Sequence, residues 1–319
     1  MAGSSLMIAT DSLTMQSAAH AWLNHLQARR RRPIKMSSAK TFESYIDKWI
    51  EPRLGHLEVS CIGVAILRDF VRQLDEARLS AKSQNELVSC VKAIIAHCAD
   101  EEGNPLFPAS KTWTGERLDL PIVSRSEQHT PIVTREEIES ALAKSKRMYR
   151  CLFALAAGSG LRIGELLSIK LIEDGTSTVF DPAAALIHVR RTLWRNQEQS
   201  TKTAAGLRDV EIPAELSAFV AEFAGCRNGF LFGNGKCLDV TTARDHLDEA
   251  IGKGIGFHAF RRFFVSHRRA NAMPEDVLKK LLGHTSGSDI TSRYNSYGSN
   301  SADRRFWVDK VGLGFNLPQ

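Results

Sequence analysis

Apolar residues recur at helical spacing through the first third of the chain. Within residues 14–99 they fall three or four positions apart, as Trp22 and Leu26 do, which is typical of amphipathic helices. One helix is predicted over residues 64–74. Ser80 is a favourable N-cap for the next helix, which ends before a polar run that contains glycine and proline. The pattern predicts a compact domain of about four helices.

Helical patterns return later in the chain. Thr134 and Glu137 have the spacing of a capping box, in which the threonine side chain and the glutamate side chain each bond a backbone N–H of the first turn. A helix is therefore predicted to begin there. Residues 149–169 are typical of two packed helices with a break at Gly158 and Gly160.

Short β-prone runs then interrupt the helical pattern within residues 176–212. Residues 185–192 and 207–212 are the clearest of these runs, and turn-like residues separate them. They predict a small antiparallel sheet. Pro213 suits the first turn of a helix, and helical spacing continues from there to about Tyr294.

These patterns predict a mainly α protein of two domains, which a chain of 319 residues is long enough to form. Prolines and weak periodicity favour a linker between the domains. We expect a disordered N-terminus at 1–13, a helical domain at 14–110, a linker at 111–129, an α+β domain at 130–298 and a C-terminal tail at 299–319.

Composition narrows the class of protein. Hydrophobic residues make up 43% and charged residues 24%, and no apolar run is long enough to cross a bilayer, so we expect no membrane partner. The six cysteines lack zinc-site spacing, which favours reduced thiols in a cytoplasmic protein. A net charge of +6 is compatible with a polyanionic partner, although many proteins that bind no nucleic acid share it.

Charged residues in the predicted second domain suggest a site. Arg162 begins a largely apolar helix, and Glu165 lies three positions on, although such a pair is more often a structural salt link. Lys202 lies in a Thr-Lys-Thr run before a flexible Ala-Ala-Gly and resembles a hairpin-tip residue. The alternative for Lys202 is an ordinary solubilising residue at a sheet edge.

Two further segments carry candidate chemistry. His258 and Arg261 are three positions apart on a predicted helix, so that both point to one face, although a surface helix in a basic region would show the same pattern. Leu-Leu-Gly at 281–283 predicts a helix end that exposes His284, and Tyr294 follows ten residues later. A lone histidine or tyrosine is more often structural.

In their order along the chain and in their residue patterns, these segments resemble the tyrosine recombinase, or phage integrase, family across residues 130–297. That family has an arginine in a Gly-Leu-Arg-x-x-Glu helix, a hairpin lysine, a His-x-x-Arg helix, a Leu-Gly-His turn and a nearby tyrosine. The resemblance implies an N-terminal helical, SAM-like core-binding domain and a C-terminal α+β catalytic domain. It implies the catalytic set Arg162, Lys202, His258, Arg261, His284 and Tyr294, supported by Glu165.

The resemblance also implies the role of each residue. Arg162 and Arg261 clamp the phosphate, since guanidinium groups hold its oxygens by paired hydrogen bonds and stabilise negative charge without a metal. Lys202 protonates the leaving oxygen, and Tyr294 is the nucleophile. The histidines are accessory donors, and His258 can also accept the tyrosine proton.

Two departures from the family pattern bear on this assignment. Phe260 stands where the family usually has leucine, which is a modest apolar change. His284 lies one residue farther from its tyrosine than in the commonest spacing, and this leaves Tyr297 as a competitor for the role of nucleophile.

The implied activity is that of a site-specific DNA recombinase or integrase of a mobile element, which forms a 3′-phosphotyrosyl intermediate and uses no metal, ATP or other cofactor. The alternatives are a Xer-like chromosome-dimer resolvase, a type IB topoisomerase-like enzyme and a catalytically inactive DNA-binding regulator. The expected partners are double-stranded DNA carrying recombination sites, three further copies of the chain in a homo-tetramer, and an accessory directionality factor.

Basic residues of the first domain are candidates for contacts with DNA phosphates, although a solvated helix end fits them equally well. They are Arg29, Arg30, Arg31, Arg32, Lys35 and Lys40. The tail contains Phe306 and Trp307 and is too apolar for a free end. By resemblance it docks on a neighbouring protomer, and the alternative is packing on its own domain.

Overall fold

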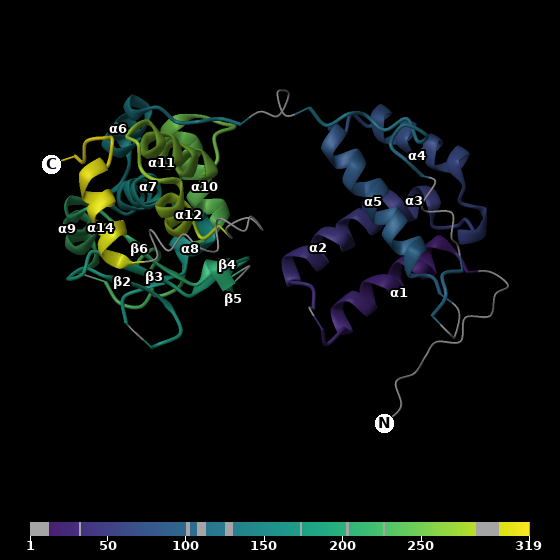
Figure 1. Cartoon of the computed structure of the whole chain (residues 1–319), viewed down its shortest axis with the longest axis horizontal. Helices are drawn as coiled ribbons and strands as arrows, with labels where there is room; N and C mark the ends of the chain where they lie inside the picture. Colours follow the sequence, from purple (N-terminus) through teal and green to yellow (C-terminus); the bar gives the residue numbers. More distant parts are fainter. Residues whose placement is uncertain are drawn as a thin grey trace. The chain divides into compact units, whose positions relative to one another are not determined.

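The computed structural model describes most of the chain, and it divides the chain into two compact units, Met1–His129 and Thr130–Gln319 (Figure 1). We call them unit 1 and unit 2 and describe each by itself. The described residues are 13–31, 33–99, 103–106, 113–124, 130–172, 174–201, 204–225, 227–284 and 300–318.

Unit 1 is helical throughout its described part. Its helices are α1 (Met15–Ala28), α2 (Met36–Tyr45), α3 (Glu51–Leu54), α4 (Val64–Glu76) and α5 (Ala81–His97), with a π-helical turn at Ile46–Ile50 that joins α2 to α3 and a 3-10 turn at Val59–Cys61. Ser80 caps α5 as the sequence predicts, because its side chain accepts a hydrogen bond from the backbone N–H of Ser83.

The core of unit 1 includes residues that the sequence assigns to the linker. Trp113 and Leu118 are buried in the same apolar cluster as helices α1 to α5. Part of the expected linker over 111–129 therefore packs on unit 1, because burial of two large apolar side chains stabilises a packed segment. Leu13 also packs against this core, and residues 1–12 of the predicted disordered N-terminus lie outside the described residues.

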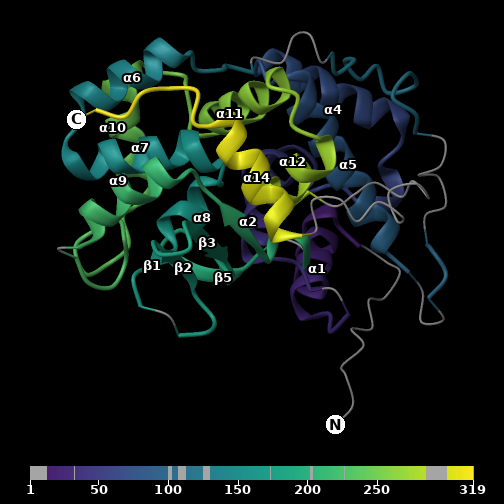
Figure 2. The same ribbon diagram turned by 60° about the vertical axis from the view of Figure 1, so that its left-hand side comes forward.

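Unit 2 combines helices with a small sheet. Figures 1 and 2 show its strands on one side and helices α6, α7, α10 and α11 on the other. The helices are α6 (Arg135–Lys144), α7 (Arg147–Ser159), α8 (Ile163–Leu167), α9 (Ala214–Ala224), α10 (Val240–Ile251), α11 (His258–Ala270), α12 (Glu275–Leu282) and α14 (Ser301–Val311). The capping box of Thr134 and Glu137 is present at the start of α6.

The sheet of unit 2 is mixed. The strands are β1 (Ile169–Lys170), β2 (Thr178–Asp181), β3 (Leu186–Val189), β4 (Arg191–Trp194), β5 (Gln197–Ser200) and β6 (Arg208–Glu211). The order β1-β2-β3-β6 is antiparallel except for the β1–β2 pair, and β4 and β5 form a separate hairpin. The predicted fold class, mainly α with a small sheet, is confirmed. The parallel pair escapes prediction because the two residues of β1 are too few to show a period.

The predicted strand over 185–192 is two strands. The backbone N–H groups of Arg190 and Arg191 donate to the Thr178 hydroxyl, at 3.1 and 2.8 Å, in place of a sheet partner. The chain therefore leaves the ladder with β6 after Val189 and begins the β4–β5 hairpin at Arg191.

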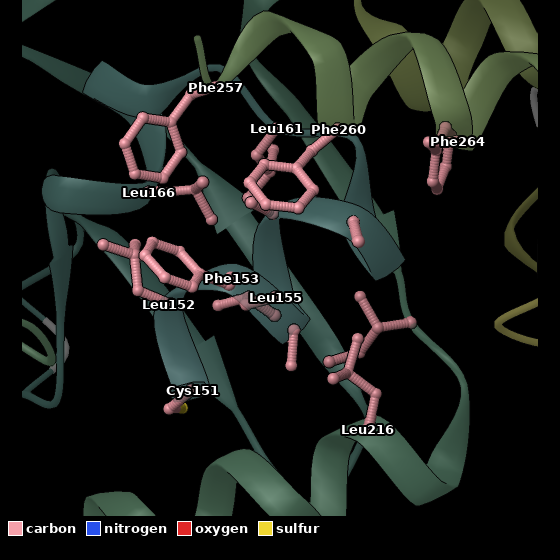
Figure 3. Close-up of a cluster of buried hydrophobic side chains, with 14 of the residues drawn as sticks. Cys151, Leu152, Phe153, Leu155, Leu161, Leu166, Leu216, Phe257, Phe260 and Phe264 are labelled. Atoms are coloured by element: carbon pink, nitrogen blue, oxygen red, sulfur yellow. The ribbon is translucent and has the colours of Figure 1, made fainter. Parts of the chain in front are cut away.

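A layer of aromatic and aliphatic side chains fills the space between α7, α8, α9 and α11 (Figure 3). The rings of Phe153 and Phe260 stack with their centroids 5.9 Å apart, and the ring centroids of Phe257 and Phe260 are 6.0 Å apart. Leu161 and Leu166 are 2% and 0% exposed in the same layer. This apolar layer fixes the positions of α8 and α11, and these helices carry most of the described candidate residues.

Helix α14 packs on its own unit. Val308 is fully buried, and the carboxylate of Glu211, also fully buried, accepts hydrogen bonds from Nε of Arg304 at 3.0 and 2.8 Å. The hydroxyl of Ser301 donates to the same carboxylate. A charge in the interior is tolerated only when such partners surround it, so this pair fixes α14 against β6.

We predict that Arg304→Ala lowers the free energy of unfolding by about 3–5 kcal/mol, because it leaves the buried Glu211 carboxylate without its cation. Urea unfolding followed by circular dichroism measures this. The matched control is Arg269→Ala, whose pair with Glu275 is exposed and should be worth less than about 1 kcal/mol. Equal losses in the two variants would show that the Glu211–Arg304 pair does not hold α14.

Candidate active site

A sharp turn between α7 and α8 presents Arg162. Helix α7 ends at Gly160, whose φ of 64° is left-handed, and a Cβ there would lie 2.6 Å from the Phe264 ring. Arg162 is the N-cap residue of α8. Its backbone N–H donates to Oε2 of Glu165 at 3.0 Å and its Nη1 to Oε1 at 3.1 Å, while 45% of its side chain stays exposed.

Glu165 is a buried carboxylate between two arginines. It is 3% exposed, and Arg208 binds both of its oxygens, through Nη1 at 3.2 Å and Nη2 at 3.0 Å. Burial by itself would raise the pKa of Glu165, but the hydrogen bonds and charge of Arg208, together with Arg162, lower the pKa below its ordinary value. The carboxylate is therefore ionised at neutral pH and neutralises one of the two positive charges that surround it.

Arg261 is held in the interior by two helix ends. It is 4% exposed, its Nη1 donates to the Gly160 carbonyl at 2.7 Å, and its Nη2 donates to the Leu282 carbonyl at 2.8 Å. Burial and the nearby charge of Arg162 lower the pKa of Arg261 to about 10, which leaves it protonated at neutral pH. Carbonyls at helix C-termini are suitable partners for a cation because they carry partial negative charge.

His284 completes this cluster. Its Nε2 lies 3.0 Å from Nη2 of Arg261, and because arginine has no acceptor, Nε2 must accept that hydrogen bond. The imidazole is then neutral. This agrees with the pKa of His284, which is lowered by partial burial and by the charges of Arg261, Arg162 and Arg208.

His258 is the first residue of α11 and is exposed. Its pKa is lowered by partial loss of hydration and by the charges of Arg262, Arg261 and Arg162. The same arginine, Arg162, thus lowers the pKa of both histidines, which places the two imidazoles in one electrostatic environment.

The structure brings Arg162, Glu165, Arg261, His258 and His284 together. Lys202, Tyr294 and the competitor Tyr297 lie outside the described residues. Arg208 is a site residue that the sequence analysis misses. The only hint in the sequence is its place six positions after Lys202, at the start of a predicted strand.

The assembled site can bind a phosphodiester. It presents a half-exposed guanidinium, a second guanidinium held by carbonyls, and two imidazoles whose lowered pKa values favour the neutral form. Among the described residues, no cluster of three or more His, Cys, Asp and Glu side chains is arranged to hold a metal ion. In the same part of the chain, no helix is long and apolar enough to span a membrane.

Comparison with known proteins agrees with this geometry. The "Tyrosine recombinase XerC-like" protein of Caldanaerobacter subterraneus subsp. tengcongensis is 24% identical over 326 aligned positions, covering 90% of this chain and 79% of that protein. The Tn1549 transposon integrase in complex with transposon right end DNA matches with a TM-score of 0.63 and 22% identity, covering 92% of this chain and 97% of that one. The chain has the tyrosine recombinase fold.

A second tyrosine recombinase structure extends the comparison. A lambda integrase tetramer bound to a Holliday junction matches with a TM-score of 0.54 and 18% identity, covering 92% of this chain and 79% of that one. No protein-family model matches the chain. The resemblance to tyrosine recombinases predicted from the sequence is confirmed, and it covers both units.

The predicted DNA-binding residues of unit 1 lie at one end of α1 and on α2. Arg29, Arg30 and Arg31 are exposed after the last turn of α1, and Lys35 is the N-cap residue of α2. Lys40 is exposed on α2 and forms an ion pair with Glu43. Arg32 lies outside the described residues.

We predict that Arg162→Gln raises the pKa of both His258 and His284, because removal of the guanidinium charge makes each imidazolium less unfavourable. Titration of the imidazole resonances by NMR measures both values. The control is Arg147→Gln, a similar charge loss at an exposed pair with Glu222. Histidine pKa values that are the same in wild type and Arg162→Gln would contradict the shared site.

Proposed function

We propose that this chain is a site-specific DNA recombinase or integrase that cleaves and rejoins DNA through a 3′-phosphotyrosyl intermediate. The observation that carries the proposal is the gathering of Arg162, Arg261 and His284. Arg261 binds the carbonyl of Gly160, two residues before Arg162, and its Nη2 lies 3.0 Å from Nε2 of His284. The relatives support it, since the solved ones are named as integrases bound to transposon ends or to a Holliday junction.

The arginines supply the main part of the catalysis. Attack on a phosphodiester places extra negative charge on the non-bridging oxygens, and donors that are already in position stabilise this charge without reorganisation. Among described residues, the hydrogen bonds of Arg261 use one N–H of Nη1 and both N–H groups of Nη2, and they leave Nε and the second N–H of Nη1 for substrate oxygens. The side chain of Arg162 contacts Glu165 with one nitrogen only, so the rest of its guanidinium can turn to the phosphate.

We assign the nucleophile to Tyr294 and the leaving-group acid to Lys202. A tyrosine hydroxyl with a pKa near 10 needs nearby positive charge or a base to react at neutral pH. The lowered pKa of His258 keeps its imidazole neutral and able to accept the tyrosine proton.

His284 has a role that depends on bound DNA. Without DNA, its Nε2 accepts from Arg261, so it does not donate from that nitrogen. A phosphate adds negative charge beside the ring and favours the imidazolium, which can then donate to a phosphate oxygen. The role of accessory donor is therefore acquired on binding.

Unit 1 is proposed as the core-binding domain, with Arg29, Arg30, Arg31 and Lys35 on DNA phosphates. We expect the working form to be a homo-tetramer on double-stranded DNA that carries recombination sites, located in the cytoplasm at the nucleoid and assisted by a directionality factor. A Xer-like resolvase is the second candidate, because the relative that covers 90% of the chain is named XerC-like. The chemistry is the same in both.

The test is to trap the covalent intermediate. Duplexes selected from a random pool by binding to the full chain are rebuilt with a nick close to the cleavage site, so that the released fragment diffuses away and religation fails. We predict a DNA adduct on Tyr294 by mass spectrometry, lost in Tyr294→Phe and retained in Tyr297→Phe. An adduct on Tyr297 would overturn the choice of nucleophile. The absence of an adduct on every tyrosine would overturn the proposed enzymatic activity.

We also predict that Arg162→Lys and Arg261→Lys slow single-turnover cleavage by about 100-fold or more, since lysine cannot reproduce the paired hydrogen bonds of the transition state. DNA affinity should change by only a few fold, because many other phosphate contacts contribute to it. Arg147→Lys serves as the control. Slower cleavage that is fully explained by weaker DNA binding would contradict the assigned role.

A further inference from the structure

Arg208 contacts the segments around three of the candidate catalytic residues. It is the first residue of β6, and its side chain is only 7% exposed. Because it is buried, its guanidinium does not lie open to DNA as that of Arg162 does. Its role must be sought in the residues that it holds.

The contacts of Arg208 lead to three parts of unit 2. Both terminal nitrogens bind Glu165 on α8, the residue that pairs with Arg162. Nε donates to the Leu281 carbonyl at 2.8 Å, at the end of the helix that precedes His284. Nη1 also donates to the Gly206 carbonyl at 3.2 Å, in the turn between the Lys202 segment and β6.

The turn before His284 lies directly on Arg208. Gly283 has a left-handed φ of 64°, and a Cβ at this position would lie 3.0 Å from Cδ and Nη1 of Arg208 and 2.8 Å from the Ala205 carbonyl. Only glycine allows so close an approach. The position of His284 is therefore set by the position of Arg208 and of the 3-10 turn at Ala204–Gly206.

The pattern of hydrogen bonds explains what Arg208 does for Arg162. Arg208 binds Glu165 with two side-chain nitrogens, whereas Arg162 reaches the same carboxylate with one side-chain nitrogen and its backbone N–H. Without Arg208, the buried carboxylate would have Arg162 as its only described cation. The strongest ion pair between an arginine and a carboxylate has two parallel hydrogen bonds. Arg162 would then be drawn onto Glu165 and away from a substrate phosphate.

We propose that Arg208 is a positioning residue for the cleavage reaction. It occupies Glu165 so that the side chain of Arg162 remains available to the phosphate, and it ties the 3-10 turn at Ala204–Gly206 to the end of α12, next to the turn that carries His284. This inference rests on the proposed recombinase function. It differs from a purely structural salt bridge, which would affect stability and leave the chemical step unchanged.

The test compares variants by single-turnover cleavage of the selected nicked duplexes, DNA affinity and thermal unfolding. Arg208→Lys keeps the charge but not the fork. The double variant Glu165→Gln, Arg208→Gln removes both charges, so that no unpaired buried carboxylate remains to unfold the protein. The matched control is Arg305→Lys, since Arg305 is also partly buried and its described partners, among them the carbonyls of Ile212 and Ala185, lie outside the candidate catalytic segments.

We expect Arg208→Lys and the double variant to cleave about 100-fold more slowly than wild type with DNA affinity within a few fold, because a displacement of about 1 Å in a catalytic group costs that much. Arg305→Lys should cleave at the wild-type rate. In the double variant the NMR-measured pKa of His284 should shift, since Arg208 is one of the charges that lower it.

The outcomes separate the two proposals. Wild type that forms no adduct overturns the proposed function, and the role of Arg208 with it. Wild type that cleaves, together with Arg208→Lys and the double variant at the same rate, overturns the positioning role alone. A loss of rate that follows thermal stability equally in the Arg305 and Arg208 variants also overturns it.

Discussion

The site depends on one buried carboxylate. Glu165 is ionised in the interior, and it can remain so only because Arg208 and Arg162 surround it. That requirement gathers positive charge at a point where α8, β6 and the end of α12 meet. Cations placed this close together repel one another. The negative charge of a bound phosphodiester would reduce this repulsion, so the cluster is suited to bind one.

Two left-handed glycines give this arrangement its geometry. Gly160 and Gly283 end α7 and α12, and both ends direct carbonyl groups to the buried guanidinium of Arg261. Each glycine is also in close contact with a side chain, Phe264 in one case and Arg208 in the other. The apolar side chains between the helices fix the positions of the helices, and the hydrogen-bonded network fixes the positions of the charged side chains.

Local sequence patterns predict many of the helices and part of the candidate site. The capping box at Thr134 and the spacing of Arg162 and Glu165 depend on residues close in sequence, and the structure has both. Arg208 was missed because its partners lie 43 and 73 positions away, so no local period marks it. For the same reason no sequence pattern predicts the burial of Trp113, which lies in a segment with few apolar neighbours.

The most direct measurement of the central claim is a crystal structure of the protein bound to duplex DNA with the scissile phosphate intact. The account predicts that Arg162 and Arg261 both donate to non-bridging oxygens of this one phosphate while Glu165 stays bound to Arg208. A phosphate that only one of the two arginines contacts, or a Glu165 carboxylate released from Arg208, would contradict it.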